Sequence, residues 1–202
     1  MRRLAAALTL AALPGAADAH AFTSGANLYA QFVEGAGVVL ATPAILLALV
    51  PLGLLIGLNG RAGMAGAWPG MLAGLVLGWI VAPSVGPGVV PAAVGVGAVL
   101  GVFGALVPDL RAPVPAALAA LAVAVAVGVA LEGHARFELP VLILAGIAFG
   151  VHLVVVLPAA LVSGSAERWH RAWLRVGWRV AASWAGAIGL IYGAFLWSGQ
   201  SA

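Results

Sequence analysis

Charged residues are scarce in this sequence of 202 residues, and cysteine and lysine are absent. Only 7% of the residues are charged, whereas a soluble domain carries about a quarter. Without cysteine the chain cannot form disulfides, iron–sulfur clusters or thiolate metal sites. All nine basic residues are arginines, too few to coat a phosphate backbone, which argues against a nucleic-acid partner. With 64% hydrophobic residues, the composition predicts a protein whose solvent is the lipid bilayer.

The first 19 residues have the pattern of a secretory signal peptide. They combine a basic start (MRR), a short apolar core and an A-x-A motif at residues 17–19. The pattern predicts cleavage after Ala19, which makes His20 the first mature residue. An uncleaved signal anchor is the alternative, and Pro14 and Gly15 disfavour it because they would break a longer helix.

Long uncharged stretches predict six transmembrane helices, since a helix needs about 20 apolar residues to cross the hydrocarbon. The sequence has no strand-like alternation, so the expected fold class is an all-α membrane protein, a bundle of six transmembrane helices after a cleavable signal peptide. The expected helices cover residues 35–58, 64–82, 89–107, 113–131, 139–162 and 176–197.

The arginines predict an orientation. If His20 lies outside, six crossings return the C-terminus to the outside as well. Arg136 then falls in an outer loop. The other arginines that follow the expected signal peptide fall inside or at the inner end of the last helix: Arg61, Arg111, Arg168, Arg171, Arg175 and Arg179. This distribution follows the positive-inside rule, although it was not assumed in placing the helices.

Small residues and prolines recur inside the expected helices. GxxxG steps occur at 70/74/78, 53/57, 97/101, 146/150 and 189/193, and such faces let helix backbones approach closely. A tight monomeric bundle is favoured over a dimer face. Pro43, Pro51 and Pro158 are expected to kink their helices, as in transport sites but also in inert bundles.

Arginine and tryptophan alternate in the segment 167–179 (ERWHRAWLRVGWR). Arg168, Arg171, Arg175 and Arg179 recur at steps of three and four residues, which places them on one face if the segment is a single helix. Trp169, Trp173 and Trp178 lie between them. The pattern predicts an interfacial helix against anionic headgroups, and docking of a cytoplasmic protein partner is the alternative.

Three isolated residues are candidate metal ligands. His152 lies at the middle of an expected helix, and an ionisable group at that depth is a functional candidate by default. A neutral imidazole hydrogen-bonded to a carbonyl or hydroxyl across a helix contact is the structural alternative. His20 could chelate a metal through its ring and its free amine. Glu34 is either a carboxylate at a pore mouth or a favourable charge at a helix N-terminus.

The segment Leu131–Pro140 (LEGHARFELP) brings four ionisable residues into an expected outer loop. Glu132, His134 and Glu138 could bind one cation, but Arg136 among them would repel it. An ordinary solvated turn is the alternative. The sequence shows no nucleophile–base set, phosphate-binding loop or zinc protease motif, which argues against an enzyme.

This layout resembles the hydrogenase/urease accessory membrane proteins of the HupE/UreJ type. LEGHARFELP is similar to that family's outer-loop pattern HG-x-AHG-x-E-x-P, GLLIGLNGRA (53–62) is similar to the end of its first helix, and His152 falls near an intramembrane histidine. The resemblance implies a six-helix protein of the bacterial inner membrane that transports a divalent metal ion such as nickel.

The sequence also departs from that family. VEGAGVVLAT (33–42) stands where the family has the metal motif HP-x4-DH, and Glu132 and Arg136 replace histidines of the outer loop. Two hypotheses therefore stand. The first is a divalent-metal permease or a divergent relative, with Glu34, Glu132, His134, Glu138 and His152 as ligands. The second is a non-transporting membrane accessory or scaffold protein that binds a partner through the segment 167–179.

Overall fold

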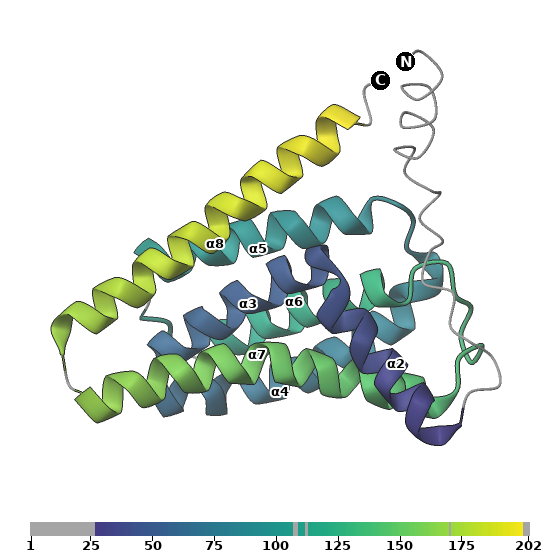
Figure 1. The fold of residues 1–202 in the computed structure, drawn as a ribbon, viewed down its shortest axis with the longest axis horizontal. Helices are drawn as coiled ribbons and strands as arrows, with labels where there is room; N and C mark the ends of the chain where they lie inside the picture. Colours follow the sequence, from purple (N-terminus) through teal and green to yellow (C-terminus); the bar gives the residue numbers. More distant parts are fainter. Residues whose placement is uncertain (1–26, 107–108, 112, 170, 200–202) are drawn as a thin grey trace, which may run out of the picture.

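The computed structural model describes residues 27–106, 109–111, 113–169 and 171–199. The expected signal peptide, its cleavage site and His20 lie outside these ranges. The described residues form α-helices and one 3-10 turn, and contain no strand. The elements are α2 (Leu28–Ala41), α3 (Pro43–Leu58), α4 (Gly60–Val81), η1 (Ala82–Ser84), α5 (Val89–Leu106), α6 (Val114–Ala130), α7 (Val141–Trp169) and α8 (Ala172–Gly199). Figure 1 shows α3 to α7 side by side, with α8 along α5 and α2 lying obliquely across α7.

Several of these helices are long and apolar enough to cross a membrane. α4 with η1, α5, α7 and α8 meet this condition alone, and the bent pair of α2 and α3 meets it together. α6 is equally apolar but has 17 residues, or roughly 26 Å at the usual helical rise, slightly less than the hydrocarbon thickness. Length and composition therefore indicate a multi-pass helical membrane protein, and the count of six spans stays a prediction.

The first expected helix, residues 35–58, is not continuous. The chain bends by 78° between α2 and α3. Thr42 is extended there, with φ −91° and ψ 110°, because the proline that follows disfavours the helical conformation. The Thr42 backbone N–H and hydroxyl both donate to the Val38 carbonyl and close the end of α2. Pro43, expected inside a helix, is instead the first residue of α3.

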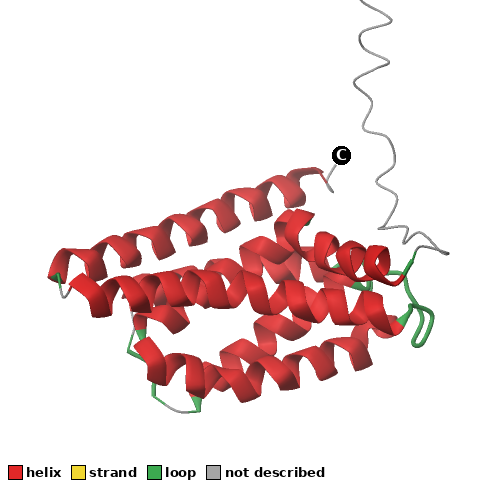
Figure 2. Cartoon of the chain, turned by 60° about the horizontal axis from the view of Figure 1, so that its bottom comes forward, coloured by secondary structure: helices red, strands yellow, loops and turns green. Residues whose placement is uncertain are grey.

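Two later helices are longer than expected, and this corrects the interpretation of the segment 167–179. α7 continues to Trp169, and α8 begins at Ala172. The segment is therefore the end of one long helix and the beginning of another (Figure 2). The prediction of a separate interfacial helix with its four arginines on one face is therefore wrong. The location of these residues at the membrane interface stays a prediction.

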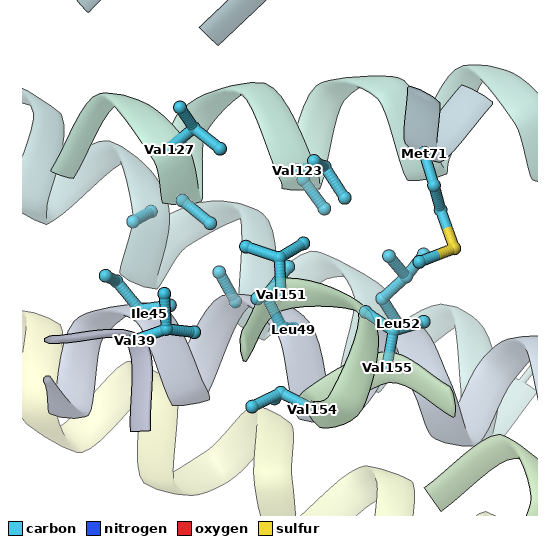
Figure 3. Close-up of a cluster of buried hydrophobic side chains, with 14 of the residues drawn as sticks. Val39, Ile45, Leu49, Leu52, Met71, Val123, Val127, Val151, Val154 and Val155 are labelled. Atoms are coloured by element: carbon cyan, nitrogen blue, oxygen red, sulfur yellow. The ribbon is translucent and has the colours of Figure 1, made fainter. Parts of the chain in front are cut away.

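α3 forms the centre of the bundle. Most of its 16 residues are buried, on all sides of the helix, because α5, α6, α7 and α8 surround it. Figure 3 shows buried side chains of α3 and of the helices around it: Val39 of α2, Leu49 and Leu52 of α3, Met71 of α4, Val123 of α6 and Val151 of α7. The interior is therefore apolar. Among the described residues, Ser165 has the one buried polar side chain.

Glycines set the distances between neighbouring helices. A Cβ at Gly74 would lie 2.7 Å from the Ala120 carbonyl oxygen of α6, and one at Gly70 would collide with the Ala116 backbone. The other predicted GxxxG steps also face helices of the same chain: 53/57 face α7, 97/101 face α3 and α8, 146/150 face α2, and 189/193 face α5. The steps thus serve a tight bundle within one chain.

We expect Gly70→Ala to lower the free energy of unfolding by about 1–3 kcal/mol, because the added methyl group forces the α6 backbone away from α4. Thermal unfolding of the purified protein in detergent measures this. Gly95→Ala is the matched control, since a Cβ there meets open space and alanine favours the helix. Equal effects of the two substitutions would contradict the close-packing argument.

Candidate functional site

The segment Leu131–Pro140, called the outer turn here after its expected location, is a closed turn whose polar groups bind its own chain and α4. The Ala135 N–H donates to Glu138 Oε2 at 2.6 Å, and His134 Nδ1 lies 3.1 Å from the Glu132 carbonyl oxygen. Phe137 has a left-handed backbone, with φ 64°, which costs about 1–2 kcal/mol for a residue with a Cβ. Its ring packs edge-on against Trp79, with 5.2 Å between the ring centroids. This contact offsets part of the strain.

Arg136 closes the C-terminal end of α4. Its Nε and Nη2 donate to the Ile80 carbonyl oxygen at 3.2 and 2.6 Å. α4 ends at Val81, so this carbonyl is one of the last four of the helix, which lack partners within it. A positive charge also interacts favourably with the negative end of the helix dipole. The arginine that weakened the metal hypothesis thus has a structural role.

The turn encloses little space for an ion. The hollow between it and the end of α4 has a volume of about 10 Å³, lined by residues that include Trp79, Leu131 and His134. That is room for about one water molecule. The arrangement is a packed outer turn rather than an open vestibule.

His152 is half-buried in α7 and is held by two neighbours. Its Nδ1 lies 2.8 Å from the Ala148 carbonyl oxygen, one turn earlier in the helix. A carbonyl only accepts, so Nδ1 carries the hydrogen, and Nε2 of the neutral ring is an acceptor. The imidazole also packs edge-on against Trp68 of α4, with 5.0 Å between the ring centroids.

Two apolar hollows lie between α4 and α7, one on either side of the contact between Trp68 and His152. The hollow toward the outer turn has a volume of about 230 Å³ and is lined by residues such as Val76, Ile147 and Ala148. The other, about 480 Å³, extends from Trp68 toward Arg61 and Ser163. The surroundings of His152 are therefore mostly hydrocarbon on both sides.

The expected metal ligands do not form a cluster. Glu34 lies on α2, His152 lies in α7, and Glu132, His134 and Glu138 lie in the outer turn. Within the described ranges, no three histidine, aspartate or glutamate side chains are placed to share a metal ion. His20 falls outside those ranges.

At the opposite end of the bundle, ion pairs connect neighbouring helix ends and turns. Arg61, at the start of α4, binds both carboxylate oxygens of Glu167 at the end of α7, at 3.1 and 2.9 Å. Arg175 of α8 pairs with Asp109. These side chains are largely exposed, so each pair contributes at most about 1 kcal/mol.

Sequence reasoning missed two polar residues that organise this end of the bundle. Asn59 donates to the Leu55 carbonyl through Nδ2 and accepts from the Leu110 N–H at 2.8 Å, which joins the α3–α4 turn to the chain after α5. Ser165 accepts from the Trp178 indole N–H at 2.8 Å, across α7 and α8. The Asn-Gly pair at 59–60 was a turn signal that could have indicated the first of these.

Comparisons with protein-family models, with curated proteins and with solved structures find no match for this chain. The resemblance to the HupE/UreJ type therefore rests on the sequence motifs alone.

Substitutions of Glu138 test whether its side chain stabilises the turn as a hydrogen-bond acceptor or acts through its negative charge. We expect Glu138→Gln to leave stability nearly unchanged, since the amide oxygen still accepts the Ala135 N–H. Glu138→Ala should lower it by about 0.5–1.5 kcal/mol, measured by thermal unfolding in detergent. Both variants being equally destabilised would show that the negative charge, and not the hydrogen bond, matters at this position.

Arg136 should contribute more to the stability of the fold than an unpaired arginine of the same chain. We expect Arg136→Gln to lower the free energy of unfolding by about 1–2 kcal/mol, because the Ile80 carbonyl at the end of α4 loses a charged donor. Arg111→Gln serves as the control, since Arg111 has no side-chain partner in the described part of the chain. Chemical unfolding in detergent compares the two, and an equal loss would reject the capping role.

Proposed function

We propose that this chain is a HupE/UreJ-like accessory protein of the bacterial inner membrane that does not carry ions through its bundle. One observation carries the proposal, the environment of His152. Its Nδ1 is bound to the Ala148 carbonyl, its ring rests on Trp68, and apolar hollows lie on both sides. An ion crossing there would lose its water without gaining comparable ligands, at a cost of several kcal/mol or more.

The exposed face of α8 supports an accessory role. α8 is the least buried of the four helices that can span a membrane alone, and it contacts the bundle mainly through Ala182, Gly186 and Gly189. Its remaining surface presents large apolar side chains: Trp184, Ile188, Leu190, Ile191 and Phe195. In the bilayer this surface is available to lipid or to a helix of a membrane partner.

The proposed orientation follows the charges. Six arginines lie toward the end of the bundle that holds Asp109 and Glu167, whereas the end with the outer turn has Arg136 with Glu132 and Glu138. The positive-inside rule places the arginine-rich end in the cytoplasm.

A divalent-metal permease is the second candidate. The hydrogen bond from His152 Nδ1 fixes the tautomer that leaves Nε2 free to bind a metal, as in many metal-binding histidines. The break between α2 and α3 also has the form of the discontinuous helices that line ion sites in transporters.

Metal accumulation in cells distinguishes the two candidates. Nickel, cobalt, copper and zinc are measured by mass spectrometry in cells with no protein, with the native chain and with His152→Leu, at matched membrane levels. We expect the three to accumulate equal amounts. Uptake that rises severalfold with the native chain and falls with His152→Leu would reject the accessory proposal and support the permease.

A further inference from the structure

A hollow at the arginine-rich end of the bundle has the composition of a phospholipid headgroup site. It lies between the C-terminal end of α3, the last turns of α7 and the beginning of α8, and has a volume of about 320 Å³. That volume is at the lower end of the usual range for small-ligand pockets. Arg171, Arg175 and Trp178 form its α8 side, and Leu58 and Val162 line it from α3 and α7. We propose that this hollow binds the headgroup of an anionic phospholipid.

The charge at the hollow favours an anion. Arg171 is exposed and has no carboxylate partner among the residues that the structure describes. Arg175 is held by Asp109, yet its side chain remains about half exposed. Each basic residue near an anionic membrane surface contributes about 1 kcal/mol to binding it. A lipid phosphate would give Arg171 the partner that the protein does not.

The walls of the hollow are fixed before any ligand binds. The Trp178 indole N–H donates to Ser165 Oγ at 2.8 Å, and Ser165 Oγ in turn donates to the Val162 carbonyl at 2.9 Å. The next residue, Arg179, donates through Nε to the Ala105 carbonyl of α5 at 2.7 Å. These bonds hold α8 against α7 and α5, so binding would order few protein groups and would cost little conformational entropy.

The apolar floor identifies a lipid rather than a free phosphate. Trp178 packs on an apolar cluster of Leu54, Val162 and Ala182 that continues from the hollow into the bundle. A free phosphate gains nothing from such a surface. A phospholipid gains binding energy from both parts of the hollow, because its phosphate contacts the arginines while its glycerol and acyl carbons contact the apolar residues. Tryptophan and arginine at the end of a membrane helix suit this boundary.

Lipid binding to the purified full-length chain tests the proposal. Native mass spectrometry from detergent compares the retention of phosphatidylglycerol with that of phosphatidylcholine carrying the same acyl chains. We expect phosphatidylglycerol to bind more tightly. Arg171→Gln should weaken its binding about fivefold, the effect of one basic residue at an anionic surface, while Arg171→Lys should retain most of it.

Arg168→Gln is the matched control, because Arg168 is three residues away, exposed and outside the lining of the hollow. We expect it to change phosphatidylglycerol binding by less than about twofold, in contrast to a residue that touches the headgroup. Equal losses in Arg168→Gln and Arg171→Gln would overturn the proposal in favour of diffuse surface charge. Equal retention of the two lipids would overturn it, and so would displacement of phosphatidylglycerol by millimolar inorganic phosphate.

Discussion

Close approach of helix backbones at glycine is the constraint on which this bundle depends. In lipid there is little hydrophobic drive to bring helices together, so association relies on van der Waals contact over small residues. Gly70 and Gly74 bring α4 onto α6, Gly146 brings α7 onto α2, and Gly97 brings α5 onto α3. α3 is thereby enclosed by its neighbours, and the polar contacts lie mainly at the ends of the bundle.

The same packing explains why the break after α2 is tolerated. Thr42 interrupts the helical hydrogen bonds within an apolar stretch, where unsatisfied backbone groups are costly. Its hydroxyl and N–H both bind the Val38 carbonyl, and its own carbonyl accepts from Ile45 and Leu46 at the start of α3. The backbone groups at the bend therefore have hydrogen-bond partners nearby. This allows α2 to leave the axis of α3 and pack across α7.

The positions of most helices could be predicted, because uncharged stretches of about 20 residues mark them directly. At Thr42 the following proline predicted a kink but not a complete break, since no charged residue interrupts the stretch from Gly35 to Leu58 and hydropathy treats it as one helix. The ends of α7 and α8 were also missed. Hydropathy marks where a helix leaves the membrane, and both helices continue beyond that point through charged residues such as Glu167 and Arg175.

The candidate site could be predicted only in part, for a related reason. Sequence position identified His152 as an unusual residue, but not that its partner would be a carbonyl of its own helix, which depends on the side-chain rotamer. In the outer turn, spacing placed Glu132, His134 and Glu138 near one another. It could not show that the turn would use Glu138 to bind the Ala135 N–H. Residue types that bind metals are also those that satisfy backbone groups.

The need to pair the last carbonyls of helices explains the positions of particular arginines in a chain with so few charges. The last carbonyls of a helix lack partners within it, and at the membrane boundary water is not freely available to them. Arg136 binds the Ile80 carbonyl near the end of α4, and Arg179 binds the Ala105 carbonyl near the end of α5. Both arginines come from other segments, so each closes a helix and fixes a tertiary contact at once. An uncharged donor would lack the favourable interaction with the helix dipole. In the outer turn, Arg136, His134 and Glu138 are thus better explained by closing α4 and the turn itself than by binding an ion.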